Sequence, residues 1–497
     1  MAGRQPAGPM HDGAPLTIDL PPAVRAVLSR LADAGLEAAL VGGSVRDLVS
    51  GATPTDWDVA TAGPPDQVAG LFPGSSWENR FGTVTVRGEP DVEVTTYRHE
   101  GRYLDRRRPE HVRWGTSLAD DLARRDFTVN AIAWRPAQPI AGDGTLVDPY
   151  DGIGDLARGV LRAVGDPAER FAEDALRMVR AVRFATRLGL LLDPATESAI
   201  AAHAADVASL SGERVRDELL RMLGGSPPAA PPSTALALME RLGLLAVLMP
   251  ELAALRGVPQ AKALPGDALD HSLRTVDALP ADGLRLRLAG LLHDLGKATT
   301  LADGHFIGHD REGARMAEDV LRRLRLPRAD AAWIVRLVRQ HMFAYTSDWT
   351  DAAVRRFVRR VGADLIDDLF ALRAADNAAS GAREPATGGM TELRQRVAAV
   401  LATDALEQGQ LAIDGNDLIA ELGAVPGPQI GELLRRLLEA VLDDPSQNTR
   451  ERLLKLARGW QSEPVDSAQR QDGEGEPSEG VDDGPAATIG DPGAVPT

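Results

Sequence analysis

Hydrophobic and polar positions change their spacing once along this 497-residue chain. Between residues 38 and 134, short apolar runs alternate with Gly, Pro and Asp, a spacing typical of strands. Beyond Phe171 the apolar positions recur every three or four residues up to Trp460, which predicts helices. The two patterns together predict an α+β protein, with a small mixed α/β head followed by an all-α body. The predicted strands are Ala38–Val41, Asp58–Thr61, Gly82–Arg87, Val92–Arg98 and Thr128–Trp134.

Changes of composition divide the chain further. Residues 1–18 are rich in Gly, Pro and Ala and are expected to form a flexible arm before the head. The helical pattern is interrupted at Gly224–Pro232 and again at Arg256–Gly266. Gly, Pro, Glu and Asp dominate the last segment, which is expected to be a disordered and dispensable tail. The predicted segments are 1–18, 19–165 (head), 166–255 (helical neck), 256–385, 386–460 and 461–497 (acidic tail).

The amino-acid composition restricts the metal sites, membrane attachment and nucleic-acid surfaces that can be expected. The absence of Cys excludes disulfide-linked partners and thiolate metal sites, so a metal ion must be held by Asp, Glu or His. No apolar run approaches 18 residues and no secretory h-region opens the chain, so we expect a cytoplasmic protein without a membrane anchor. The net charge is −17, but residues 461–497 carry nine acidic groups and one Arg, about half of that excess. A nucleic-acid surface would therefore have to be a local basic stripe.

The strongest local signal is Val41-Gly-Gly-Ser-Val-Arg-Asp47, followed by Thr55-Asp-Trp-Asp58. Alternate side chains of a strand share a face, so Asp56 and Asp58 should converge while Trp57 packs on the opposite side. Carboxylates suit Mg²⁺, and Gly42 and Gly43 would let backbone N–H groups approach phosphates. A single Asp-x-Asp or Gly-Gly is common on surfaces, whereas the combination indicates a magnesium–triphosphate site.

A second signal is Asp121-Leu-Ala-Arg-Arg-Asp-Phe-Thr-Val-Asn-Ala131. Taken alone, it reads as a charged turn that leads into a strand. Together, the two signals resemble the nucleotidyltransferase head of the DNA polymerase beta superfamily, in particular the class II CCA-adding tRNA nucleotidyltransferases and bacterial poly(A) polymerases. The resemblance implies that Arg46 and Arg125 hold the triphosphate, that Asp126 orients Arg125, and that Asn130 reaches the sugar or a phosphate.

Two further features lie between these motifs. The segment Arg98–Trp114 is charged and contains Gly and Pro, which predicts a mobile loop. Relatives that add only CC are shortened at this place, so its presence favours addition of the terminal A; a basic loop that merely attracts RNA is the simpler alternative. Glu93 lies on a predicted strand and is a candidate third carboxylate of the metal site.

The third signal is Phe171-Ala-Glu-Asp-Ala-Leu-Arg-Met-Val-Arg180. Read as one helix, it places Asp174, Arg177 and Arg180 as neighbours three residues apart, which by itself is an ordinary surface ion pair. The resemblance implies a larger role: the Asp174–Arg177 pair would select CTP and ATP by the donor and acceptor pattern of the base edge, with Arg180 in support. The next segment, Ser211–Leu223, is expected to brace this helix.

Five of the nine histidines lie between residues 271 and 341. With two aspartates they match the pattern of an HD phosphohydrolase domain and predict a site for a divalent transition metal. The resemblance associates such domains with phosphodiesterase or phosphatase action on 2′,3′-cyclic and 2′-phosphate ends. The candidate ligands are His271, His293, Asp294, His309, His341 and Asp376.

The sequence thus predicts template-independent transfer of CMP and AMP from CTP and ATP to the 3′ end of a tRNA, gripped at its acceptor arm. Asp56 and Asp58 would carry two Mg²⁺ ions. Poly(A) polymerase and an A-only enzyme remain alternatives, because they share the chemistry of the head. An HD phosphohydrolase with an RNA-binding head and a nonenzymatic RNA chaperone are further alternatives.

Overall fold

The computed structural model describes residues 12–78, 82–100, 112–114, 117–224, 230–260, 262–381 and 387–461. The start of the predicted arm, the centre of the predicted Arg98–Trp114 loop and nearly all of the acidic tail lie outside these residues. The chain divides into two compact units. The first contains Met1–Asp348 and Val361–Arg394, and the second contains Trp349–Arg360 and Gln395–Thr497. No helix of the described ranges is long and apolar enough to cross a membrane.

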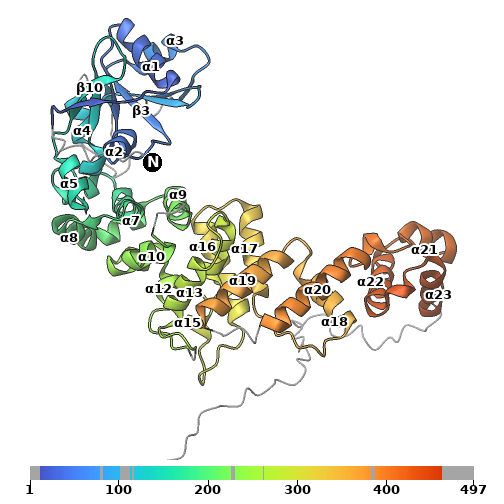
Figure 1. The fold of residues 1–497 in the computed structure, drawn as a ribbon. Helices are drawn as coiled ribbons and strands as arrows, with labels where there is room; N and C mark the ends of the chain where they lie inside the picture. The colour runs from blue at the N-terminus through green and yellow to red at the C-terminus, as the bar shows by residue number, and fades with distance from the viewer. Residues whose placement is uncertain are drawn as a thin grey trace, which may run out of the picture. The chain divides into compact units, whose positions relative to one another are not determined.

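An eight-stranded mixed sheet forms the head (Figure 1), with the strand order β1-β10-β9-β2-β3-β6-β5-β4. Only β3 and β6 pair in parallel; the other neighbours are antiparallel. The fold class predicted from the sequence is confirmed. The strands are β1 (Pro15–Thr17), β2 (Ala38–Val41), β3 (Trp57–Thr61), β4 (Ser76–Glu78), β5 (Thr83–Val86), β6 (Val92–Thr96), β9 (Ala133–Pro136) and β10 (Asp143–Val147).

Alternation along the strands gives the sheet two apolar faces. Leu40 and Val59 pack with helices α1 (Pro22–Asp33) and α3 (Pro65–Leu71) on one face. Their neighbours in the strands pack on the opposite face with α4 (Leu118–Ala123), which Figure 1 shows across the sheet from α1. Trp57 is buried on the α1 face, so the side chain of Asp58 lies on the α4 face.

Two predictions about the head were wrong in detail. Residues 15–17 do not belong to a loose arm, because β1 pairs with β10 at the sheet edge. The predicted strand Thr128–Trp134 is split into a 3₁₀ turn, Thr128–Asn130, and strand β9. The two ends of the predicted Arg98–Trp114 loop are instead strands, β7 (Arg98–Glu100) and β8 (Val112–Trp114), which pair with each other. The remaining head helices are α2 (Gly43–Val49) and α5 (Gly152–Arg158).

Helices form the rest of the chain, apart from the two-residue strands β11 (Val160–Leu161) and β12 (Leu191–Leu192), which pair in parallel. In the second unit, Arg355 of α18 donates to the Leu442 carbonyl of α22 and so ties these helices together. The helices of the first unit are α6 (Pro167–Glu173), α7 (Leu176–Leu188), α8 (Pro194–His203), α9 (Gly212–Leu223), α10 (Pro232–Arg241), α11 (Leu244–Leu248), α12 (Pro250–Ala253), α13 (Ala268–Asp277), α14 (Leu284–Leu292), α15 (Lys297–Thr300), α16 (His309–Arg323), α17 (Arg328–Gln340) and α19 (Ile366–Ala379). The others are α18 (Asp351–Val361), α20 (Thr387–Thr403), α21 (Gly415–Leu422), α22 (Pro428–Asp443) and α23 (Arg450–Gln461).

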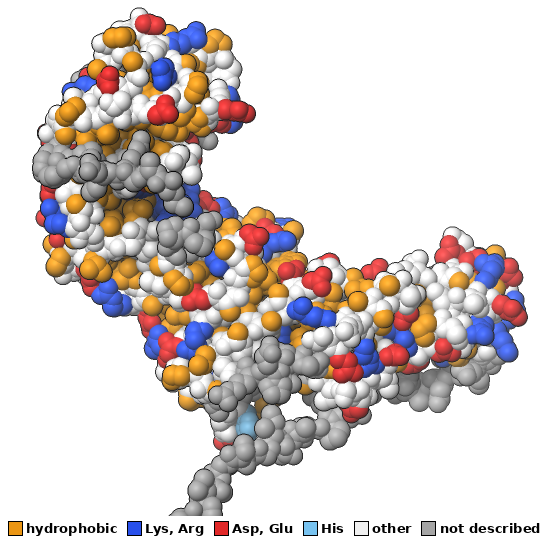
Figure 2. Space-filling model, in the orientation of Figure 1, with side chains coloured by type: hydrophobic (Ala, Val, Ile, Leu, Met, Phe, Trp, Pro, Cys, Tyr) orange, Lys and Arg blue, Asp and Glu red, His pale blue; other side chains and the backbone are white. Residues whose placement is uncertain are grey.

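Acidic and basic side chains are interspersed over the face of the molecule that Figure 2 shows. Many of them form ion pairs along or between helices, such as Arg323 with Glu251 and Arg450 with Glu421. An exposed arginine paired in this way offers less unbalanced charge to a phosphate backbone than a free one. The charge pattern therefore does not by itself locate an RNA-binding surface.

Candidate active site and candidate metal centre

The turn between β2 and α2 brings backbone close to charged side chains. Gly42 has φ +71°, and its N–H donates to the Ile132 carbonyl at 3.1 Å. A Cβ atom at this position would lie 2.7 Å from Nη1 of Arg125 and 3.6 Å from Oδ2 of Asp58. Both the backbone conformation and the space therefore require glycine. Gly43 begins α2, the helix that carries Arg46.

Three carboxylates gather at the parallel pair β3–β6. Asp56 precedes β3, Asp58 lies on it, and Glu93 is the register partner of Asp58 on β6. Burial, with Arg125 lowering it and Glu93 and Asp56 adding smaller increases, raises the pKa of Asp58 to about 6. A carboxylate that is hard to ionise beside two others is the environment that a divalent cation relieves. The donor set therefore fits a hard metal ion such as Mg²⁺.

Arg125 is held by a residue that the sequence reading missed. Asp121, which is fully buried, accepts from Nε and Nη2 of Arg125 at 3.3 and 3.0 Å. Burial opposes ionisation, but the Arg125 and Arg124 guanidinium groups hold the pKa of Asp121 below its usual value. The prediction that Asp126 orients Arg125 was wrong. The spacing of four residues between Asp121, on α4, and Arg125, just after it, was the available signal.

Asp126 and Asn130 are instead buried connectors. Asp126 accepts from Nδ2 of Asn130 at 3.1 Å and from Nε of Arg180 at 2.8 Å. Asn130 in turn accepts from Nη1 of Arg46 at 2.7 Å through its side-chain oxygen. Nη1 of Arg125 donates to the Asn130 backbone carbonyl at 3.2 Å. Both predicted phosphate-binding arginines are thus fixed to one asparagine.

The predicted continuous helix at Phe171–Phe184 is broken, which is a correction to the sequence reading. Helix α6 ends at Glu173 and α7 begins at Leu176, with Asp174 in extended conformation between them. Asp174 accepts from both terminal nitrogens of Arg214, at 3.0 and 2.6 Å. Arg177 is buried and donates to Glu173 at 2.5 Å and to the Arg124 carbonyl at 2.8 Å. The residues are therefore not successive neighbours on one helix face.

Helix α9 braces this region, as predicted. Besides the Arg214–Asp174 pair, Glu218 of α9 is buried and accepts from Nε of Arg183 on α7 at 2.5 Å. Glu218 also accepts from Arg221 at 3.1 Å. Glu218 is thus a second buried anchor that the sequence reading did not single out, although the charges on its helix were expected to pack against α7.

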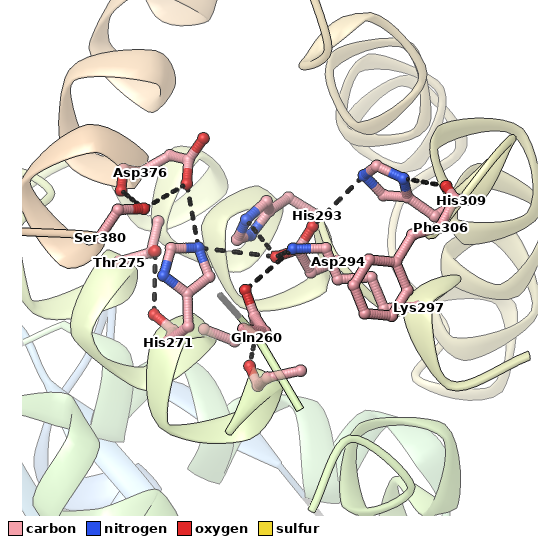
Figure 3. Close-up of polar contacts among 12 residues, drawn as sticks. Gln260, His271, Thr275, His293, Asp294, Lys297, Phe306, His309, Asp376 and Ser380 are labelled. Carbon is pink, nitrogen blue, oxygen red and sulfur yellow. Dashed lines mark hydrogen bonds and ion pairs between the residues drawn. The ribbon is translucent and has the colours of Figure 1, made fainter. Parts of the chain in front are cut away.

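All six predicted ligands of the second site come together in the first unit. Figure 3 labels five of them: His271, His293, Asp294, His309 and Asp376. The six ligands form two groups, each with its ligand atoms within 4.8 Å of one another: His271, His293 and Asp376, and Asp294, His309 and His341. Asp294 joins the groups, since its Oδ2 lies 3.1 Å from Nε2 of His293 and its Oδ1 lies 3.6 Å from Nε2 of His309. The turn that follows α14 carries His293 and Asp294, which corrects the predicted helical placement.

The imidazoles are oriented as metal ligands. Nδ1 of His293, His309 and His341 faces a backbone carbonyl at 2.8, 2.7 and 2.6 Å respectively. Their Nε2 atoms are buried and have no hydrogen-bond partner in the part of the chain that the structure describes. Burial also lowers the pKa of His309, which favours the neutral, ligating form. Three lone pairs directed at a buried carboxylate fit a divalent cation.

The fold and the carboxylate site define a nucleotidyltransferase head joined to a helical body. Family models match along the chain: the poly(A) polymerase head domain over residues 38–162, the RNA- and SrmB-binding site of polymerase A over 189–255, and tRNA nucleotidyltransferase domain 2 over 313–457. An A-adding tRNA nucleotidyltransferase of Deinococcus radiodurans is 38% identical over 428 residues, 81% of this chain and 91% of that protein.

A CCA-adding enzyme of Lactiplantibacillus plantarum is 31% identical over 463 residues, 88% of this chain and 95% of that protein. The crystal structure of the Bacillus stearothermophilus CCA-adding enzyme with CTP superposes with a TM-score of 0.64 at 29% identity, covering 89% of this chain and 99% of that one. The chain belongs to the family of tRNA nucleotidyltransferases that contains the CCA-adding and A-adding enzymes. Membership implies divalent-metal catalysis at the head.

Proposed function

We propose that this chain is a CCA-adding tRNA nucleotidyltransferase that transfers CMP and AMP from CTP and ATP to the tRNA 3′ end. The observation that carries the proposal is the position of Asp58 between Glu93 and Asp56, facing Gly42 and Arg125. Full-length relatives named as A-adding and CCA-adding enzymes support the substrate assignment. We place the protein in the cytoplasm, because its relatives are named for their action on tRNA.

The head residues have distinct tasks in this reaction. Asp56, Asp58 and Glu93 would hold Mg²⁺, which when bound activates the attacking hydroxyl and neutralises charge on the phosphates. The terminal 3′ oxygen of the tRNA bonds to the α-phosphorus of the nucleotide, the hydroxyl proton leaves, and the bond to pyrophosphate breaks. Arg46 and Arg125 face the departing phosphates, and the missing side chain of Gly42 leaves room for them.

Base selection is assigned to Asp174 and Arg177, with support from Arg180. A carboxylate acceptor beside a guanidinium donor complements the edges of cytosine and adenine and leaves uracil and guanine poorly paired. Asp174 is held by Arg214, and Arg177 by Glu173, so each group is fixed in place before a base arrives. Arg180 acts indirectly, because it is bonded to Asp126. Asp174→Ala should therefore lose discrimination among nucleotides before it loses phosphate binding.

The decisive experiment uses tRNA transcripts that end before C, after C and after CC. Each is incubated with CTP, ATP or both in the presence of Mg²⁺, and the product ends are sequenced. Addition that stops at CCA supports the proposal. Addition of A to the CC-ended transcript alone would make the chain an A-adding enzyme, and long A tails a poly(A) polymerase. The double variant Asp56→Ala, Asp58→Ala should abolish every extension.

A second candidate function rests on the histidine–aspartate cluster. We propose that it holds one or two divalent transition-metal ions and supports an accessory phosphohydrolase activity, for which the three carbonyl-oriented imidazoles are the supporting observation. Metal content of the purified full-length protein should fall in the double variant His309→Ala, His341→Ala but not in Asp56→Ala, Asp58→Ala. Equal metal content in the unaltered protein and in both double variants would contradict the proposal.

A further inference from the structure

Two of the chain's three lysines point at the histidine–aspartate cluster, although nearly all other basic residues are arginines. Nζ of Lys297 lies 2.6 Å from Oδ2 of Asp294. Nζ of Lys262 lies 3.4 Å from Oδ1 of Asp376 and 2.8 Å from Nε2 of His271. Both lysines thus bring ammonium groups to the carboxylates that would bind metal.

The loop that carries Lys262 is anchored at both ends. Arg256 pairs with Glu240 and Asp267, and the Gly257 N–H donates to Asp267 at 2.7 Å. Further along, the Leu264 N–H donates to the Ser380 carbonyl at 3.4 Å, beside the helix that carries Asp376. The loop is therefore held across the cluster by several contacts, and its polar side chains are presented there by the fold.

One of these side chains has an unused donor. Oε1 of Gln260 accepts from Nζ of Lys297 at 3.1 Å, as Figure 3 shows. Its Nε2 is buried and has no hydrogen-bond partner within the described ranges. Leaving a buried N–H group unpaired costs free energy, so this group is available to a ligand with an acceptor oxygen.

The charged groups around the histidine–aspartate cluster indicate which class of ligand it would bind. Lys262, Lys297 and Arg373, which donates to Asp376 at 3.0 Å, already outnumber the two aspartates, so each divalent ion adds two further unmatched positive charges. A metal ion bound to Asp294 and Asp376 also takes the oxygens that the ammonium groups contact. The two lysines then require another anion in the same place, and phosphate oxygens bind both metal ions and ammonium groups.

We propose that Lys262, Lys297 and the Gln260 amide form the phosphate-binding part of the cluster and hold the phosphate group of an ester beside the metal. The inference rests on the proposed metal site and adds to it the residues that bind substrate.

The test uses the full-length Asp56→Ala, Asp58→Ala protein, which lacks the head metal ligands, loaded with Mn²⁺. Inorganic phosphate is titrated in, and paramagnetic broadening of its ³¹P resonance reports phosphate bound next to Mn²⁺. Lys262→Met and Lys297→Met should each weaken phosphate binding at least about 10-fold, the scale of one lost charged hydrogen bond. Lys455→Met removes the third lysine of the chain, which lies in α23. This variant is the matched control and should leave phosphate binding unchanged.

Mn²⁺ binding, followed by electron paramagnetic resonance, separates the possible failures. If the parent protein binds no Mn²⁺, the metal site itself is wrong. If Mn²⁺ binds but phosphate relaxes equally in the parent and in both lysine variants, the lysines only neutralise the aspartates and the inference is overturned. Lys262→Arg, which keeps the charge, should retain most of the phosphate affinity and guards against a variant that merely misfolds.

Discussion

Replacing Asp58 by Asn should stabilise the metal-free head while it destroys catalysis. Burial, reinforced by Glu93 and Asp56, raises the Asp58 pKa from 3.8 to about 6. The folded head therefore binds a proton more tightly than the unfolded chain does, and stability falls as the pH rises between the two values. A difference of roughly two pKa units corresponds to about 3 kcal/mol at most. The neutral amide avoids this cost.

The pH dependence follows from the same numbers. Above pH 6, Asp58 is ionised in both states and the full cost of about 3 kcal/mol is present. At pH 5 the folded head keeps most of its protons, so the cost falls to about half. The gain in stability from Asp58→Asn should therefore be smaller at pH 5 than above pH 6. Bound Mg²⁺ should remove it, because the cation stabilises the ionised carboxylate in the wild type alone.

Hydrogen exchange followed by mass spectrometry isolates the head from the other parts of the chain. Peptides that cover β2, β3 and β6 should exchange up to about 100-fold more slowly in Asp58→Asn at pH 7.5 with chelator present, and about 10-fold more slowly at pH 5. Asp91→Asn is the matched control of opposite sign, because the Gly88 N–H and Arg87 lower the pKa of that exposed carboxylate. Faster exchange in Asp58→Asn, or a gain independent of pH, would refute the reasoning.

Three further results are expected. Nucleotidyl transfer should fall about tenfold per pH unit below pH 6 as Asp58 becomes protonated, with a midpoint that moves lower at higher Mg²⁺; a midpoint insensitive to Mg²⁺ would contradict this. Gly42→Ala should lower kcat/KM at least tenfold in a folded protein, because φ is +71° and the new Cβ lies 2.7 Å from Arg125; steady-state kinetics with CTP provides the check. Glu218→Gln should destabilise the neck by about 3 kcal/mol because it leaves buried guanidinium groups unbalanced, whereas exposed Asp217→Asn should have little effect in the same exchange assay.

Sequence periodicity predicted β2, β3, β5 and β6, because successive residues of these strands alternate between the two faces of the sheet, but it missed β1, β4 and β10. Leu40 and Val41 illustrate this, since successive residues pack in different apolar clusters. It failed at Asp174, where the apolar residues of α6 and α7 keep helical spacing across a break. A local pattern contains no record of the partner that stabilises such a break, here Arg214, which lies 40 residues away.

The grouping of the candidate histidine ligands could be predicted for a different reason. Histidine is rare in this chain, so the position of five of its nine histidines between residues 271 and 341 suggests a metal even without geometry. What the sequence could not supply was orientation: which imidazole nitrogen faces a carbonyl depends on how each helix ends. The positions of Gln260 and Lys262 beside the cluster could not be predicted from the sequence either. Both residues lie on a loop without a periodic pattern and approach the cluster only through tertiary contacts.

The segment around Arg125 shows why a motif can be longer than the set of residues that touch substrate. Arg125 is the residue of this segment that lies nearest to Gly42. The backbone carbonyl of Arg124 and the side chains of Asp126 and Asn130 connect the segment to helices of the neck and to α2, so replacing either of these side chains would leave a buried polar group unpaired. The connections are the Arg124 carbonyl to Arg177, Asp126 to Arg180 and Asn130 to Arg46. Arg177 and the proposed phosphate-binding residues therefore share one hydrogen-bonded network, and a shift of α7 would alter the position of the arginines that are proposed to bind the triphosphate.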